Sequence, residues 1–180
     1  MQQRLWLSIA AVSEGHQLPP EPSHAELART LVATSNRGVL STVALDPPGY
    51  PFGSVATYGL DERGRPVVFV STMAEHTRNA TADPRASLLV AEPVAPGSDP
   101  LAAGRATLIG DLLPVPDAER AAVRTLYLDA NPASASYIDF GDFGFWRLEV
   151  RSVRYVGGYG RMSWVDPDVY RASPSPDPRF

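Results

Sequence analysis

The sequence predicts a mainly β protein, an antiparallel barrel with short helices at its ends. Apolar segments rich in β-branched residues follow one another with few helices between them, which argues against a doubly wound fold with a parallel sheet. The 180 residues also include 18 Pro and 14 Gly, which favours short elements joined by turns over a bundle of long helices. This length is typical of one domain with a sizeable core.

The expected elements follow in chain order. Strands are predicted over residues 38–45, 54–58, 67–71, 87–91, 105–115, 143–150 and 152–156. Helices are predicted from Ser23 to about Ser35, from Thr72 to about Ala82 and from Pro116 to Asp129. The first two begin with the pattern of a capping box, in which a hydroxyl and a glutamate each accept a backbone amide. Gly110 marks a bulge in the fifth strand.

The same pattern divides the chain into three parts. Residues 1–22 are expected to form an N-terminal arm and linker, residues 23–165 the barrel domain, and residues 166–180 a Pro-rich tail that is disordered or wraps the domain. Met1 to Val12 lacks the long apolar stretch and cleavage site of a signal peptide. No apolar run approaches the ~18 residues of a membrane span. We therefore expect a cytoplasmic protein that does not contact a membrane.

Missing residue types exclude several kinds of chemistry. The chain has no Cys, which excludes disulfides, thiolate nucleophiles and Cys-ligated metals. All 16 basic residues are Arg, so a Walker-A loop and a lysine Schiff base are excluded. The three His are scattered, and no metal site is expected. A net charge of −4 argues against a nucleic-acid partner.

The segment VVFVSTMAEHTRN, residues 67–79, is the most informative. A strand runs directly into a helix start, where free amides and the helix dipole favour an anion. Hydroxyl, imidazole, amide and guanidinium donors gather there, and the guanidinium of Arg78 matches a phosphate. The alternative interpretation is a capping box followed by an ordinary solvated helix.

Two further segments suit a planar ligand. YPFGSVATY, residues 50–58, has small side chains that would let a ring lie against the backbone, although an edge strand explains it equally. Residues 143–164 place aromatic side chains among arginines, which could clamp an aromatic anion, form a dimer interface or belong to a core strand. No residue stands out as a catalytic acid, base or nucleophile, and no GxSxG motif is present.

Five segments, in this order, resemble the FMN-binding split-barrel superfamily of the pyridoxamine 5′-phosphate oxidases, and within it most closely the HugZ-like group linked to haem utilisation. They are GVLSTVAL, YPFGSVATY, VVFVSTMAEHTRNATADPRASLLV, RATLIGDLLPV and FWRLEVRSVRYVGGYGRMSW. The resemblance covers Glu26 to Val165, and the HTRN-x-x-x-DPR stretch is its most specific part.

The resemblance implies a six-stranded antiparallel split barrel that forms a homodimer with an FMN site at each of two equivalent places in the subunit interface. The phosphate would be held by Ser71, Thr72, His76, Thr77, Arg78 and Asn79. The flavin ring would lie along Ser54, Val55, Ala56 and Thr57, and the partner subunit would contribute the region of Trp146.

The expected function is thus an FMN-dependent oxidoreductase. Since the chain has no Lys, pyridoxamine phosphate is not carried over as its substrate. HugZ-type haem oxygenases have a C-terminal domain with a haem-ligating His, whereas this chain has no His after His76. The alternatives are a non-catalytic haem- or flavin-binding protein, or a reductase using the deazaflavin F420, whose anionic tail Arg147, Arg151 and Arg154 would hold.

Overall fold

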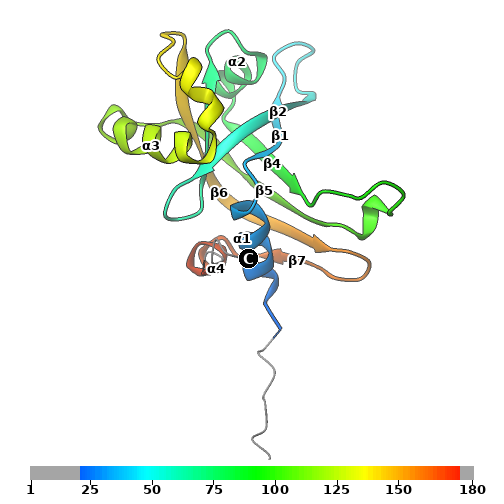
Figure 1. Ribbon diagram of the computed structural model, residues 1–180. Helices are drawn as coiled ribbons and strands as arrows, with labels where there is room; N and C mark the ends of the chain where they lie inside the picture. The colour runs from blue at the N-terminus through cyan, green and yellow to red at the C-terminus, as the bar shows by residue number, and fades with distance from the viewer. Residues whose placement is uncertain (1–20, 175–180) are drawn as a thin grey trace, which may run out of the picture.

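A computed structural model describes residues 21–174 (Figure 1). The predictions for residues 1–20 and 175–180, including the absence of a signal peptide, lie outside the described residues. The strands are β1 Arg37–Val43, β2 Pro51–Leu60, β3 Pro66–Ser71, β4 Arg85–Ala91, β5 Gly104–Pro114, β6 Phe143–Gly157 and β7 Met162–Val165. The α-helices are α1 His24–Ala33, α2 Glu75–Ala82, α3 Arg120–Ala130 and α4 Pro167–Ala172.

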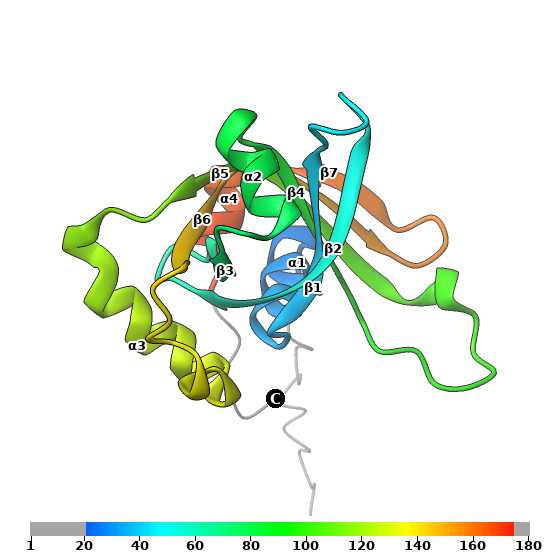
Figure 2. The same ribbon diagram turned by 90° about the horizontal axis from the view of Figure 1, so that it is seen from above.

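Six strands close into an antiparallel barrel in the order β3-β2-β1-β4-β5-β6, because β3 also pairs with β6. The predicted six-stranded split-barrel fold is confirmed. Strand β6 is long enough to pair with β3 through Phe143–Arg147 and with β7 through Val153–Val156. In Figure 1, α2 lies at the upper end of the barrel, α1 and α4 lie at the lower end, and α3 lies outside it. Figure 2 shows the ring of strands from above.

Several predicted elements have different limits. The two strands expected over 143–150 and 152–156 are one continuous strand, and β7 was not predicted. The bulge is confirmed, since the β5–β6 register shifts between Ile109 and Gly110. A Cβ on Gly110 would lie 2.1 Å from the Glu149 carbonyl oxygen, which explains the glycine.

The two predicted capping boxes have opposite outcomes. At α1, Ser23 and Glu26 form both hydrogen bonds of the box. At α2 the predicted box is absent, because the helix begins at Glu75 and its N-cap, Ala74, makes no side-chain bond. The Thr72 amide instead donates to the Asp142 carbonyl at 2.7 Å. This bond continues the β3–β6 pairing and keeps Thr72 out of the helix.

The packed part of the chain also extends beyond Val165, where the sequence analysis placed the start of the tail. Residues 167–172 form α4, and its Tyr170 side chain is fully buried. The Tyr170 hydroxyl donates to the Gly64 carbonyl at 3.1 Å. One large apolar side chain thus fastens this segment to the lower end of the barrel, in spite of the surrounding prolines.

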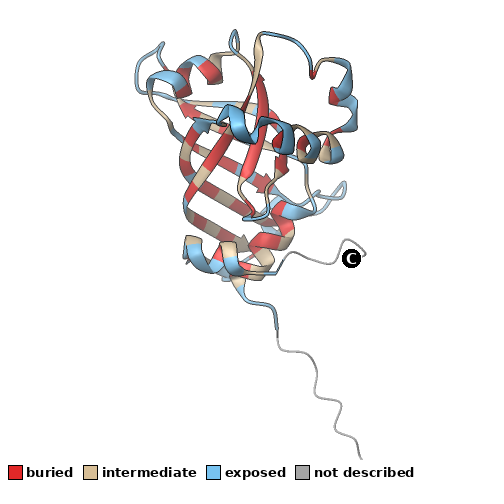
Figure 3. Ribbon diagram, turned by 90° about the vertical axis from the view of Figure 1, so that its left-hand side faces the viewer, coloured by how far each residue is buried: buried red, intermediate tan, exposed pale blue. Residues whose placement is uncertain are grey.

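The buried side chains form two clusters. The larger fills the barrel and continues beneath α1, and the smaller lies between α3 and the outer faces of β3 and β6. Strand β3 serves both, since Val68 and Val70 face the barrel interior while Val67 and Phe69 face α3. Figure 3 shows buried and more exposed residues alternating along much of the other strands. Within the described part of the chain, no helix is long and apolar enough to cross a membrane.

Candidate functional site

The predicted phosphate corner, where β3 ends, is occupied by a carboxylate of the chain itself. The Ser71 hydroxyl donates to Asp142 Oδ2 at 2.7 Å and accepts the Met73 amide at 3.1 Å. The Thr72 amide donates to the Asp142 main chain. The Ser71 hydroxyl and the Thr72 amide are therefore already used at the point where a phosphate would need them.

Arg78 lies on the exposed side of α2. Its guanidinium pairs with the Glu75 carboxylate one helical turn earlier, and 59% of the side chain remains exposed. An exposed pair of this kind contributes little stability and exchanges easily. Arg78 can therefore still turn to a ligand, but Glu75 and Asp142 together place two negative charges at the corner.

A cavity of about 540 Å³ adjoins this corner and brings together part of the predicted set. It is lined by Leu45, Thr72, Thr77, Arg78, Thr81, Ala82 and Trp146. Thr77 is buried, and its Oγ1 has no hydrogen-bond partner. The Trp146 in this cavity belongs to the same chain, whereas the resemblance implied a tryptophan region from the partner subunit.

His76 and Asn79 point inward and fasten α2 to the barrel. His76 Nδ1 lies 3.0 Å from the Ser54 hydroxyl, and its Nε2 is buried without a partner. Burial lowers the pKa of the His76 imidazole. The Asn79 amide is fully buried, donates to Thr42 Oγ1 at 3.1 Å and accepts the Leu45 amide at 3.1 Å. These two side chains hold the helix in place and do not face the cavity beside Arg78.

The four residues predicted to line a flavin ring divide between two faces of β2. Ser54 and Ala56 point into the barrel, whereas Val55 is 77% exposed and Thr57 binds the Tyr127 hydroxyl at 2.7 Å. This division follows from the alternation of side chains along a strand. At most two of the four side chains can line any one ligand on the outer face.

A larger groove lies between α1 and the strands β1, β2 and β4, and the sequence analysis missed it. Its volume is about 590 Å³. Val39 is paired with Val55 on one side and with Leu89 on the other, so that these three form an apolar row across the sheet. The complete lining is Leu27, Thr30, Leu31, Thr34, Ser35, Asn36, Arg37, Gly38, Val39, Val55, Leu89, Ala91, Glu92, Pro93 and Tyr155. The sequence held one signal for this groove, namely apolar residues on strand faces that no predicted helix covers.

The charged groups beside this groove are few. Arg37 and Glu92 line it, and both are exposed. Tyr155 forms part of its wall, and the pKa of its phenol is raised by burial and by the nearby Glu92. Across residues 21–174, no cluster of three or more His, Asp or Glu side chains is placed to bind a metal ion.

The three arginines considered for an F420 tail do not form one basic groove. Arg147 is buried and pairs with Glu119 at 2.6 Å. Arg151 pairs with Asp111, and the Arg154 guanidinium lies 5.4 Å from the centre of the Trp164 ring. Their charges are thus directed to separate partners within the chain.

Comparisons with known proteins place the chain in a family. A family model described as "CREG, beta-barrel" matches residues 19–172. A structure described as a heme binding protein from Mycobacterium smegmatis is 46% identical, with a TM-score of 0.80 over 87% of this chain and 63% of that one. A curated protein, "Non-canonical heme oxygenase HOZ, chloroplastic" from Arabidopsis thaliana, is 40% identical over 136 residues, which are 76% of this chain and 41% of that protein. The chain thus spans less than two thirds of the length of either relative.

A more distant structure shares the fold of this chain. This protein from Clostridium acetobutylicum is described as belonging to the pyridoxinephosphate oxidase family. It is 16% identical, with a TM-score of 0.59 over 78% of this chain and 92% of that one. The closed six-stranded barrel and the extent of the family match lead to one conclusion: the chain has the split-barrel fold and belongs to the CREG beta-barrel family.

Proposed function

We propose that this protein binds haem in the groove between α1 and strands β1, β2 and β4. The observation that carries the proposal is the apolar, solvent-open lining of this groove, in a chain 46% identical to a protein described as heme binding. Haem is a flat and largely apolar ring with two carboxylates. Sites for such ligands are mostly apolar, with a few charged groups that set orientation.

The residues of the groove fit that chemistry. Leu27, Val39, Val55 and Leu89 offer an apolar surface for the ring, and Arg37 offers a guanidinium for a propionate. No His belongs to the lining. Tyr155 is the lining residue that could bind the iron, because a tyrosine oxygen is a known iron ligand in haem proteins. Haem would therefore be held chiefly by apolar packing.

FMN is the second candidate, and the cavity beside Trp146 favours it. Thr72 and the exchangeable Arg78 line this cavity and would meet a phosphate there. Against it stand the carboxylates of Asp142 and Glu75, which use the neighbouring donors. The haem groove also contains a carboxylate, Glu92, but its Arg37 forms no ion pair among the described residues. For this reason we rank an oxidoreductase acting through FMN second.

We also propose that the protein forms a homodimer through the outer face of the barrel. Five successive cross-strand pairings join six residues into one row on this face. The row runs Val55–Val39–Leu89–Thr107–Arg154–Trp164. The apolar members of this face are exposed in the single chain: Val39, Val55, Leu89, Ile109, Met162 and Trp164. Several exposed apolar side chains on one face are typical of an interaction surface. A second copy of the same chain would cover this face symmetrically, and haem would then lie between the two copies where Val39, Val55 and Leu89 line the groove.

A spectroscopic titration tests the haem proposal. Haemin added to the purified protein should give a shifted Soret band that saturates at one haem per chain. Val55→Asp should weaken binding at least tenfold, because it places a charge in the apolar row. Val94→Asp changes an exposed valine outside the groove and is the matched control. Tyr155→Phe should move the band only if the phenol ligates iron.

Two results would overturn the haem proposal: an unshifted Soret band, or equal haem affinity in the Val55→Asp variant. FMN is titrated in parallel by quenching of its fluorescence. Saturable FMN binding without haem binding would put the second candidate first.

A further inference from the structure

A cavity of about 460 Å³ lies between α3 and the turn that joins β2 to β3. Part of its lining is apolar and consists of Leu60, Ala118, Ala122, Val123 and Leu126, three of which belong to α3. The rest of the lining is charged and comes from the turn, from the segment before α3 and from β6. No residue of this cavity lines the proposed haem groove or the cavity beside Trp146.

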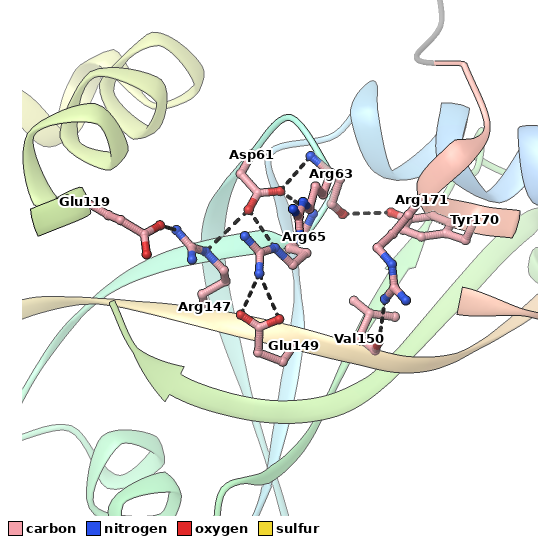
Figure 4. A network of polar contacts seen from close by, with 10 residues as sticks. Asp61, Arg63, Arg65, Glu119, Arg147, Glu149, Val150, Tyr170 and Arg171 are labelled. Carbon is pink, nitrogen blue, oxygen red and sulfur yellow. Dashed lines mark hydrogen bonds and ion pairs between the residues drawn. The ribbon is translucent and has the colours of Figure 1, made fainter. Parts of the chain in front are cut away.

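Four of the charged side chains that line this cavity are paired with one another. Arg65 Nε donates to Asp61 Oδ2 at 2.8 Å, and Arg147 Nη2 donates to Glu119 Oε2 at 2.6 Å. Asp61 Oδ2 also lies 3.4 Å from Arg147 Nε, so the two pairs form one network (Figure 4). Arg65 reaches a further carboxylate, Glu149, outside the lining. The network joins the turn and the segment before α3 to β6, and its two positive and two negative charges within the lining balance.

Glu62 and Arg63 are the remaining two charged residues of the lining, and they are adjacent in the turn. Both are exposed, and within residues 21–174 neither side chain forms an ion pair or a hydrogen bond. Of Arg63 only the backbone is used, since its amide donates to Asp61 Oδ1 at 3.0 Å. The cavity therefore offers one free carboxylate and one free guanidinium from consecutive residues, whose Cα atoms are about 3.8 Å apart.

We propose that this cavity binds a free apolar α-amino acid such as leucine. The carboxylate of the ligand would accept N–H groups of Arg63, and its ammonium group would lie at the carboxylate of Glu62. Its side chain would pack against Val123 and Leu126, which belong to the apolar part of the lining. All of these residues line the cavity, and both charged groups are open to solvent.

The charges of the lining favour a zwitterion over an ion of one sign. The lining carries three positive and three negative side chains, so a ligand without net charge leaves this balance intact. A simple anion would bind Arg63 but lie close to the free carboxylate of Glu62, and a simple cation would meet the converse problem at Arg63. In an α-amino acid both charged groups are attached to one carbon atom, which suits a carboxylate and a guanidinium from consecutive residues.

Thermal unfolding of the full chain tests the site, with four probes added separately at the same ionic strength. L-leucine should raise the Tm saturably, because a ligand that binds only the folded state stabilises it. The other probes each lack one feature: 3-methylbutylamine has no carboxylate, 4-methylpentanoate has no ammonium group and glycine has no side chain. Each should bind roughly tenfold more weakly than leucine, because it loses one charge-assisted or one apolar contact.

Variants of the two exposed residues test the assignment without disturbing the core. Arg63→Gln and Glu62→Gln should each weaken leucine binding roughly tenfold. Glu62→Gln should also let 4-methylpentanoate bind as tightly as leucine, since the ammonium group no longer finds a carboxylate. Arg161→Gln and Asp117→Asn change exposed charges outside the cavity and are the matched controls. The proposal is overturned if leucine leaves the Tm unchanged, if the amine or the acid alone binds wild type as tightly as leucine does, or if both variants behave like the controls.

Discussion

The Ser71 hydroxyl donates a hydrogen bond to the Asp142 carboxylate, with 2.7 Å between the two oxygens. Ser71 ends β3 and Asp142 immediately precedes β6, so that this bond joins the two strands that close the barrel. It also uses a hydroxyl that a cofactor phosphate would require. The same contact therefore serves the fold and opposes FMN binding.

Replacing Asp142 by Asn should strengthen FMN binding. The variant removes a negative charge from the corner where the phosphate would lie and keeps a side chain of the same size. We expect an affinity increase of roughly tenfold, equivalent to about 1.4 kcal/mol, measured by quenching of FMN fluorescence. Asp139→Asn, which changes an exposed acid paired with Arg124, should have no effect. Unchanged or weaker FMN binding by Asp142→Asn would contradict the location of the phosphate.

Ile109→Glu should convert the proposed dimer to a monomer. Ile109 lies on the exposed apolar face but outside the haem groove, so the change separates association from ligand binding. A buried charge in the centre of an interface costs several kcal/mol. Light scattering coupled to size-exclusion chromatography measures the mass. Leu101→Glu changes an exposed leucine in the short 3-10 helix before β5, Pro100–Ala102, and is the control. A monomeric wild type would refute the dimer directly.

The stability of the protein should fall as the pH drops below 6.5, in part because of His76. Burial lowers the pKa of this imidazole from its ordinary value of 6.5. The unfolded chain therefore binds the proton at a higher pH than the folded chain does, and the free energy of unfolding decreases through this range as pH falls. His76→Gln should reduce the Tm difference between pH 7 and pH 5. The interpretation fails if wild type and variant lose the same number of degrees.

Tyr170 should make α4 a stabilising part of the domain. Tyr170→Phe removes the hydrogen bond to Gly64 and should cost about 1 kcal/mol. Tyr170→Ala also leaves a cavity at the lower end of the barrel and should cost about 3–5 kcal/mol. Urea unfolding followed by tryptophan fluorescence measures both. Val169→Ala, at an exposed position of the same helix, is the control. Equal stability of Tyr170→Ala and wild type would mean that α4 does not stay docked.

Much of the secondary structure could be predicted because its signals are local. The Ser23–Glu26 capping box, the apolar β3 segment and the glycine at the β5 bulge all appear where the sequence indicates them. The capping box at Thr72 failed for a reason outside its own segment. The Thr72 amide bonds to Asp142, which lies seventy residues further along the chain, and local pattern cannot reveal that competition. The same applies to β7, which depends on pairing with β6.

The candidate sites could likewise be predicted only in part from the sequence. The residue types around Arg78 could be recognised from the sequence, since a strand that leads into a helix offers free amides to an anion. Whether those donors are free depends on which carboxylates the fold brings beside them, and it brings Asp142 and Glu75. The groove lined by Val39 and Val55 could not be recognised, because its walls come from α1 and four separate strands.

By itself, the sequence determined the barrel class, the missing chemistries and most strands and helices, because composition and residue period act over a few neighbouring residues. Only the tertiary structure decided which donors remain unpaired, which apolar faces lack a helix over them and that Glu62 and Arg63 line one cavity with residues of α3. Those properties depend on distances between residues far apart in the chain, and such distances are set only when the barrel closes.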